Sequence, residues 1–171
     1  MKKIIAALSM VMLTISATSM AQPKTVTLKF IETSDVHGCF FPYNFTTGKE
    51  MRGSMARVST YVKELRKEYG DNLILLDNGD ILQGQPISYF YNYVNTDEEN
   101  IAASVINYME YDAVTIGNHD IETGHSVYDK WIKEVKCPVI AANIVCFDTL
   151  KQQTIPYTSS ENNNTRRYYT Q

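Results

Sequence analysis

Hydrophobic and polar positions follow two different periods along this chain of 171 residues. Residues 25–32 alternate apolar with polar side chains and are rich in β-branched residues, which predicts a strand with one buried face. Residues 72–76 form a near-continuous apolar run, the pattern of a strand covered on both faces in a parallel sheet. Similar runs at 113–116 and 138–145 predict a third and a fourth strand.

Helical patterns lie between these predicted strands. Apolar residues spaced three and four apart over 55–69 predict an amphipathic helix that a glycine ends. The aromatic-rich stretch 86–93 predicts a short helix, and Thr96 with Glu99 forms a capping-box pattern for the next one. A further helix is expected over 127–135. Strands that alternate with helices imply right-handed crossovers, so the predicted fold class is α/β with mostly parallel βαβ units.

The amino terminus has the pattern of an export signal. Two lysines precede an apolar stretch over residues 4–15, and Ser19 and Ala21 supply small residues at a cleavage site. Residues 1–21 are therefore interpreted as a secretory signal peptide, which indicates an exported, periplasmic protein. A membrane anchor is the rival interpretation, but the apolar stretch is short for a span and no second one follows, so no stable anchor is expected.

The composition of the chain indicates one folded domain followed by a polar tail. With 44% hydrophobic and 20% charged residues, the chain has the makeup of one soluble domain, which we place at residues 22–150. From 151 to 171 Gln, Asn, Ser and Thr dominate, and this tail is expected to be disordered. Outside the signal, 14 basic residues face 19 acidic ones, a net charge of −5 that offers no attraction for a nucleic acid polymer.

Polar clusters follow the first three predicted strands directly. They are Asp35-Val36-His37-Gly38, Gly79-Asp80 and Gly117-Asn118-His119. Because the carboxyl ends of parallel strands line one edge of a sheet, these clusters are expected to converge there.

The residue types in these clusters are suited to holding metal ions. Asp35 and His37 are two residues apart, so in an extended backbone both side chains leave on the same side and could grip one ion. Asp80 could bridge that ion to a second, to which Asn118 could offer its amide oxygen. This mixed donor set suits Mn, Zn, Fe or Mg. Two such ions would supply a metal-activated hydroxide for in-line attack on a phosphoryl group, with His119 placed to stabilise charge on the phosphoryl group or to protonate the leaving oxygen.

These motifs resemble those of the calcineurin-like metallophosphoesterases. Residues 76–84 and 53–57 narrow the resemblance to the exported branch of 5′-nucleotidases and 2′,3′-cyclic-nucleotide phosphodiesterases, over about residues 25–149. The resemblance implies the N-terminal half of a β-sandwich flanked by helices, two divalent metal ions and a small-molecule nucleotide or phosphate ester as substrate.

The resemblance also implies a role for each candidate residue. Asp35 and His37 would bind the first metal, Asp80 would bridge, and Asn118 would bind the second. His119 would be the catalytic histidine with an acidic partner. The family usually reads Asn-His-Glu-x-Asp, whereas Asp120 and Glu122 exchange the two acids here, so Glu122 takes the position of the partner acid.

One departure from the family pattern leaves two functions open. The family completes its site with further histidines, including a Gly-His-x-His motif, but this chain has only His37, His119 and His125. His125 is interpreted as a helix-start or surface residue, so the second metal site is expected to be incomplete. The chain is then either an exported, metal-dependent hydrolase of nucleotides or a truncated, non-catalytic fragment that retains a partial metal site.

Overall fold

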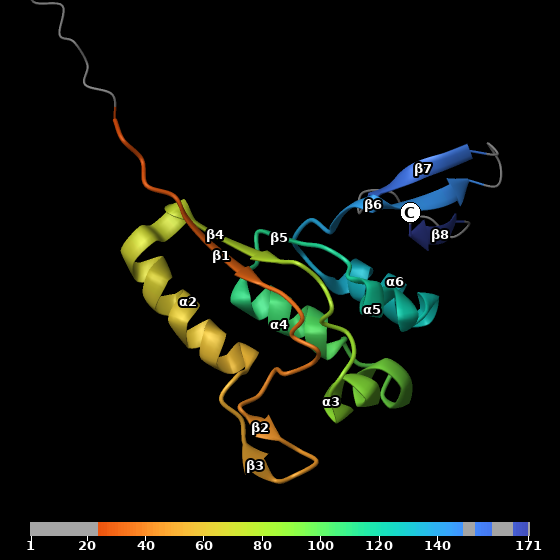
Figure 1. The fold of residues 1–171 in the computed structure, drawn as a ribbon, viewed down its shortest axis with the longest axis horizontal. Helices are drawn as coiled ribbons and strands as arrows, with labels where there is room; N and C mark the ends of the chain where they lie inside the picture. The colour runs from red at the N-terminus through yellow and green to blue at the C-terminus, as the bar shows by residue number, and fades with distance from the viewer. Residues whose placement is uncertain (1–23, 149–152, 159–165, 171) are drawn as a thin grey trace, which may run out of the picture.

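The computed structural model describes residues 24–148, 153–158 and 166–170, and Figure 1 shows how their elements are arranged. The predicted signal peptide lies outside these residues. In chain order the elements are β1 (Lys29–Thr33), β2 (Tyr43–Asn44), β3 (Lys49–Glu50), α2 (Met55–Tyr69), the 3-10 turn η1 (Gly70–Asn72), β4 (Leu73–Asp77), α3 (Pro86–Tyr89), the π-helical turn η2 (Phe90–Val94), α4 (Ile101–Met109), β5 (Ala113–Val114), α5 (Asn118–Glu122), α6 (His125–Glu134), β6 (Ile140–Asp148), β7 (Gln153–Thr158) and β8 (Arg166–Thr170).

A three-stranded parallel sheet forms the centre of the fold. Its strand order is β1-β4-β5, with Lys29 opposite Leu73 and Thr33 opposite Asp77. The chain crosses from β1 to β4 through α2 and from β4 to β5 through α4, and both helices lie on the same side of the sheet (Figure 1). The α/β class and the parallel βαβ units predicted from the sequence are therefore confirmed.

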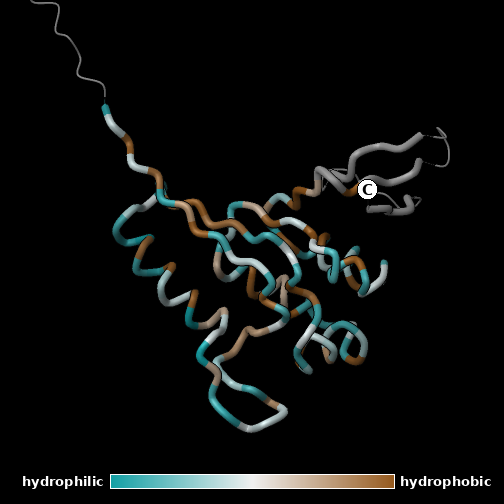
Figure 2. The backbone as a smooth tube through the Cα atoms, in the orientation of Figure 1, coloured by the Kyte–Doolittle hydropathy of each residue, from teal (hydrophilic) through white to brown (hydrophobic). Residues whose placement is uncertain are grey.

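The core lies between this sheet and its helices. Leu73 and Leu75 of β4 are buried, whereas Ile74 and Leu76 are half-buried and Phe30 of β1 is 60% exposed opposite Ile74. Figure 2 shows hydrophobic stretches converging where the helices meet the sheet. The prediction that β4 is covered on both faces was wrong for the described residues, because α2 and α4 pack on one face only.

Two helix starts show how local sequence sets the boundaries. Helix α2 begins after Ser54, whose side chain accepts the Arg57 N–H, and covers the predicted range. Helix α4 begins after Asn100, whose side chain accepts the Ala102 N–H at 2.9 Å. The predicted capping box of Thr96 and Glu99 was wrong, because Asn100 occupies the cap position and Glu99 instead accepts a hydrogen bond from a later serine hydroxyl.

The chain leaves the parallel sheet after α6. A single parallel bridge joins Val139 to Val114, and β6 then pairs antiparallel with β7 and β8 in a second sheet of order β7-β6-β8. The stretch 138–145 is thus not a full fourth strand of the first sheet. Two parts of the tail expected to be disordered, residues 151–171, are strands, and their β-branched and aromatic residues are typical of strands.

None of the helices in the described ranges is long and apolar enough to cross a membrane. The longest of them, α2, has 15 residues and carries charged side chains on one side.

Candidate metal centre

Three loops at the carboxyl ends of the central strands are tied together by backbone hydrogen bonds. The Asp35 N–H donates to the Gly79 carbonyl oxygen at 3.1 Å, and the His37 N–H donates to the Asp80 carbonyl oxygen at 2.9 Å. The carboxylate of Asp80 accepts the His119 N–H at 2.8 Å. The structure thus brings the three polar clusters together at one edge of the sheet.

Three side chains in these loops form a group that could hold a metal ion. His37, Asp80 and His119 each offer a ligand atom, and these atoms all lie within 4.8 Å of one another. The two imidazole rings lie 5.4 Å apart between centroids, and Asp80 is 8% exposed. Two imidazoles and a carboxylate are common ligands of divalent transition metals, so the donor set fits such an ion.

The backbone at the candidate ligands is unusual. Asp35, His37 and Asp80 have φ angles of 52°, 48° and 59°, three of the four positive values at non-glycine residues in the described ranges. Such left-handed conformations are uncommon for non-glycine residues, although Asp and His adopt them more readily than most, and they concentrate at functional sites. The sequence-based picture of an extended backbone from Asp35 to His37 was therefore wrong, because the loop turns sharply to bond the Gly79 and Asp80 carbonyls.

The other two predicted ligands, Asp35 and Asn118, stand in the chain close to members of this group. The carboxylate of Asp35 is exposed and accepts a hydrogen bond from the Ser34 hydroxyl, and it is not among the three grouped ligands. Asn118 is exposed at the first position of α5. Its position is fixed by its neighbours, since Gly117 and His119 each donate a backbone N–H to a buried carboxylate.

The carboxylate that accepts the Gly117 N–H belongs to Asp120, a residue for which the sequence analysis predicted no role of its own. Its side chain is fully buried and accepts four backbone N–H groups, at distances of 2.8 to 2.9 Å. The donors are Asp80, Ile81, Leu82 and Gly117. Burial raises the pKa of Asp120, and the four hydrogen bonds oppose that rise. Asp120 therefore fixes the loop that carries Asp80 against the loop that carries His119.

A sequence signal could have found Asp120. It stands three residues after Gly117, the N-cap of α5, and an acidic residue at that position often accepts the N–H of the cap residue. The structure contains this bond.

His119 is held by an acidic partner and an amide. Its Nδ1 lies 2.8 Å from Glu122 Oε2, and Gln83 Nε2 donates to the same carboxylate oxygen at 3.1 Å and to the His119 carbonyl at 2.9 Å. The bond to Glu122 raises the pKa of His119, and the same bond lowers the pKa of Glu122. Glu122 thus stands where the sequence suggested a partner acid, whereas Gln83 was missed.

Comparison with known proteins agrees with this arrangement of loops. Residues 28–169 match the family described as calcineurin-like phosphoesterase. The chain belongs to this family. The resemblance inferred from the sequence motifs is thereby confirmed, and the partial metal site lies in a family whose members are phosphoesterases.

The names of several relatives of this chain describe enzymes that act on nucleotides. It is 33% identical over 137 residues to the trifunctional nucleotide phosphoesterase protein YfkN of Bacillus subtilis, covering 76% of the chain and 9% of that protein. It is 29% identical over 161 residues to the 2′,3′-cyclic-nucleotide 2′-phosphodiesterase/3′-nucleotidase of Haemophilus influenzae, covering 92% of the chain and 24% of that protein. The chain thus spans a quarter or less of these curated relatives.

A solved structure agrees with the fold. The crystal structure of calcineurin-like phosphoesterase YfkN from Bacillus subtilis superposes with a TM-score of 0.66 at 31% identity, covering 72% of this chain and 39% of that one. The α/β fold of this chain is therefore shared with the family.

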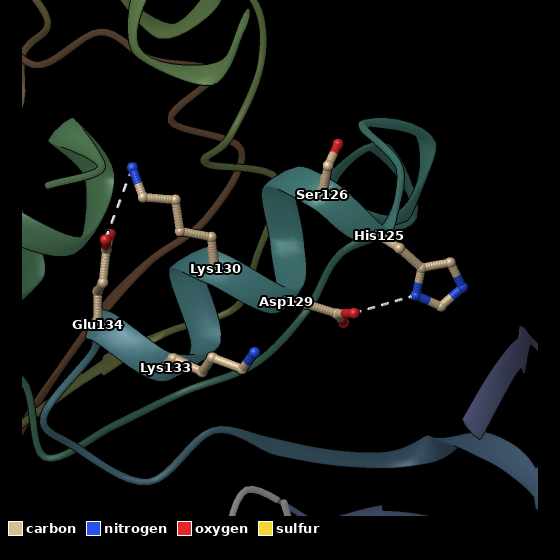
Figure 3. A pocket seen from close by; sticks show the side chains of 6 residues that line it. All are labelled: His125, Ser126, Asp129, Lys130, Lys133 and Glu134. Atoms are coloured by element: carbon tan, nitrogen blue, oxygen red, sulfur yellow. Dashed lines mark hydrogen bonds and ion pairs between the residues drawn. The ribbon is translucent and has the colours of Figure 1, made fainter. Parts of the chain in front are cut away.

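The third histidine of the chain lies elsewhere. His125 is the first residue of α6, and its Nδ1 lies 2.8 Å from the Tyr128 hydroxyl and 3.2 Å from Asp129 Oδ2. Figure 3 shows its ring projecting from the start of the helix, beside a surface hollow lined by charged residues of α6. It is a helix-start surface residue, as the sequence indicated, and not part of the ligand group.

The raised pKa of Asp77, at the end of β4, predicts that the stability of the chain depends on pH. Burial raises the pKa of its carboxyl from 3.8 to about 6, against hydrogen bonds from the Thr33 hydroxyl and the Gly79 N–H. Between these pH values the folded chain holds more protons than the unfolded chain. The free energy of unfolding should therefore fall as pH rises from about 4 through 6, by up to about 3 kcal/mol in total.

Urea unfolding at pH 4, 5, 6 and 7 measures this effect in the wild type and in Asp77→Asn. The variant should lose this part of the pH dependence. Its free energy of unfolding should therefore fall less between pH 4 and pH 7 than that of the wild type. Parallel curves for the two proteins would mean that Asp77 does not titrate in this range.

Proposed function

We propose that this chain carries the centre of a metal-dependent phosphoester hydrolase of the 5′-nucleotidase type, acting on extracytoplasmic nucleotides. The observation that carries the proposal is the group of His37, Asp80 and His119 within 4.8 Å at the carboxyl edge of a parallel sheet. Family membership supports phosphoester hydrolysis. The names of the relatives support nucleotides as the substrate class.

We assign Asp35 and His37 to a first divalent ion, Asp80 to a bridging position and Asn118 to a second ion. When bound, such ions polarise a phosphoryl oxygen and lower the pKa of water. The donor set is compatible with Mn, Zn, Fe or Mg. The second ion has fewer ligands from this chain, since its sequence contains three histidines and His125 is bonded within α6.

His119 is assigned as the catalytic histidine and Glu122 as its partner. With Nδ1 directed at Glu122, Nε2 is the nitrogen that can face a substrate. The Glu122 carboxylate favours the protonated imidazole, because it raises the pKa of His119. The imidazolium can stabilise charge on the phosphoryl group and donate a proton to the leaving oxygen.

An extracytoplasmic location is part of this proposal. It is supported by the signal-peptide pattern of residues 1–21, where two lysines precede a short apolar stretch and small residues. Export would place the chain where free nucleotides, rather than nucleic acid polymers, are the substrates, in agreement with its net negative charge.

Metal removal tests the proposal. Phosphate release from adenosine 5′-monophosphate and from 2′,3′-cyclic adenosine monophosphate should disappear after treatment with a chelator and return when Mn²⁺ or Zn²⁺ is restored. Metal affinity is measured in parallel by calorimetry. Saturable metal binding without phosphate release would contradict the proposal and favour the alternative, a non-catalytic chain with a partial metal site.

A further inference from the structure

Asp77 is a buried carboxylate to which the proposed function assigns no role. It is the last residue of β4, it is 3% exposed, and it stands shortly before Asp80 in the chain. Each of its carboxylate oxygens has a hydrogen-bond partner. Oδ1 accepts the Gly79 N–H at 3.0 Å, and Oδ2 accepts the Thr33 hydroxyl at 2.6 Å. Since a buried carboxylate is costly without such partners, these two bonds fix its orientation.

Gly79, which Asp77 holds, lies where the three loops of the candidate centre meet. Its carbonyl oxygen accepts the Asp35 N–H of the first loop at 3.1 Å, and the residue itself belongs to the second loop, directly before Asp80. A Cβ added to Gly79 would lie 2.3 Å from the backbone nitrogen of Gly117, so the third loop packs directly against it. Its φ of 90° and the lack of room for a side chain both require glycine. A shift of Gly79 would therefore disturb all three loops.

Two hydroxyls in series hold the other carboxylate oxygen of Asp77. Thr33, at the end of β1, donates to Oδ2, and its Oγ1 lies 2.8 Å from the Tyr111 hydroxyl. Because the single hydroxyl proton of Thr33 goes to Asp77, Tyr111 is the donor in the second bond. Burial raises the pKa of Tyr111, which therefore keeps the proton that it donates. A chain of hydrogen bonds thus runs from Tyr111 through Thr33 and Asp77 to Gly79.

We propose that Asp77, oriented by the Thr33 hydroxyl, is a positioning residue that holds Gly79 and thereby sets the spacing of the metal-binding loops. The inference rests on the proposed function, because it concerns the metal ligands that are assigned there. Asp77 binds no ion itself and acts through Gly79 on the loops of Asp35 and Asp80. Residues that orient metal ligands in this way are typically worth about 10–100-fold in metal affinity or activity.

Thr33→Val tests the inference, because it removes the hydroxyl and keeps the branched shape of the side chain. Calorimetric titration of the full chain with Mn²⁺ should show an affinity weaker than that of the wild type by about tenfold or more. Thr33→Ser keeps the hydroxyl and should restore the affinity of the wild type. Thr60→Val is the matched control, since the Thr60 hydroxyl donates to the Ala56 carbonyl within α2. Its Mn²⁺ affinity should equal that of the wild type.

Tyr111→Phe is a milder second variant, because Thr33 still donates to Asp77 and only the outer hydroxyl is lost. Its Mn²⁺ affinity should fall by less than that of Thr33→Val. Unchanged affinity in Thr33→Val, or in Tyr111→Phe if Thr33→Val does not fold, would overturn the inference. A loss that Thr33→Ser does not reverse would overturn it too, since that loss would come from packing and not from the hydroxyl.

The proposed function and this inference can fail separately, because Mn²⁺ affinity is measured without turnover. A wild type that binds Mn²⁺ and releases no phosphate contradicts the proposed function alone, and the affinities of the variants still decide the role of Asp77. A wild type without saturable Mn²⁺ binding overturns both, since no metal centre is then present to be positioned.

Discussion

Asp80→Asn should reduce metal-dependent phosphate release by about a thousandfold or more, because it removes several kcal/mol of metal-based stabilisation from the transition state. Asp80 is 8% exposed and lies with His37 and His119 in the ligand group. The asparagine retains an oxygen that can accept the His119 N–H, so the hydrogen bond between the loops can persist. The melting temperature should therefore change little while the negative charge at the centre is lost.

Asp71→Asn is the matched control for this variant. Asp71 is an exposed acid in η1, directly before β4 and thus at the opposite end of the strand from Asp80. This change also removes one negative charge, but phosphate release should equal that of the wild type. Full activity of Asp80→Asn, or an equal loss in both variants, would contradict the assignment of Asp80 to the metal centre.

Asp120→Ala should lower the free energy of unfolding by about 4 kcal/mol or more, since an unsatisfied buried donor costs about 1–3 kcal/mol and four lose their acceptor. This is a large share of the total stability of a domain, about 5–15 kcal/mol. Asp120→Asn should lower the free energy of unfolding by less. Its amide oxygen still accepts hydrogen bonds from backbone N–H groups, whereas its NH₂ group cannot accept them. Urea unfolding at pH 7 measures both variants.

Glu122→Ala provides the comparison for stability. The Glu122 carboxylate is 61% exposed and bonds to His119 and Gln83, so its removal should change the urea midpoint little. A urea midpoint for Asp120→Ala equal to that of the wild type would show that the four backbone N–H groups find other partners. Asp120 would then not be the residue that joins the two loops.

The sequence predicted the parts of the fold that depend on local patterns. The helix over 55–69 was predictable because its apolar period, the serine at its start and the glycine at its end agree with one another. The parallel pairing of β1 with β4 followed from strands that alternate with helices.

Features that depend on distant partners could not be predicted in the same way. An apolar run such as that of β4 does not reveal whether one face or both are covered. The strands β7 and β8 lie in a polar segment, and they form through pairing with β6, which no local pattern reports.

The same distinction holds for the candidate site. Convergence of His37, Asp80 and His119 followed from parallel topology, and the contact of His119 with Glu122 follows from their spacing of three residues on a helix. The hydrogen bonds that join Asp120 to the loop of Asp80 could not be predicted from local sequence, because three of its four donors lie about forty residues earlier in the chain. The left-handed backbone of Asp35 and His37 likewise depends on carbonyls from another loop.

Anomalous X-ray diffraction from crystals of the chain grown with Mn²⁺ tests whether the group of His37, Asp80 and His119 is a metal centre, because it locates the ion without relying on activity. An anomalous peak is expected at this group, within coordination distance of His37 and Asp80, and no such peak is expected in crystals of Asp80→Asn. Manganese bound elsewhere on the chain, with no peak among these three side chains, would contradict the assignment of this group as the metal centre.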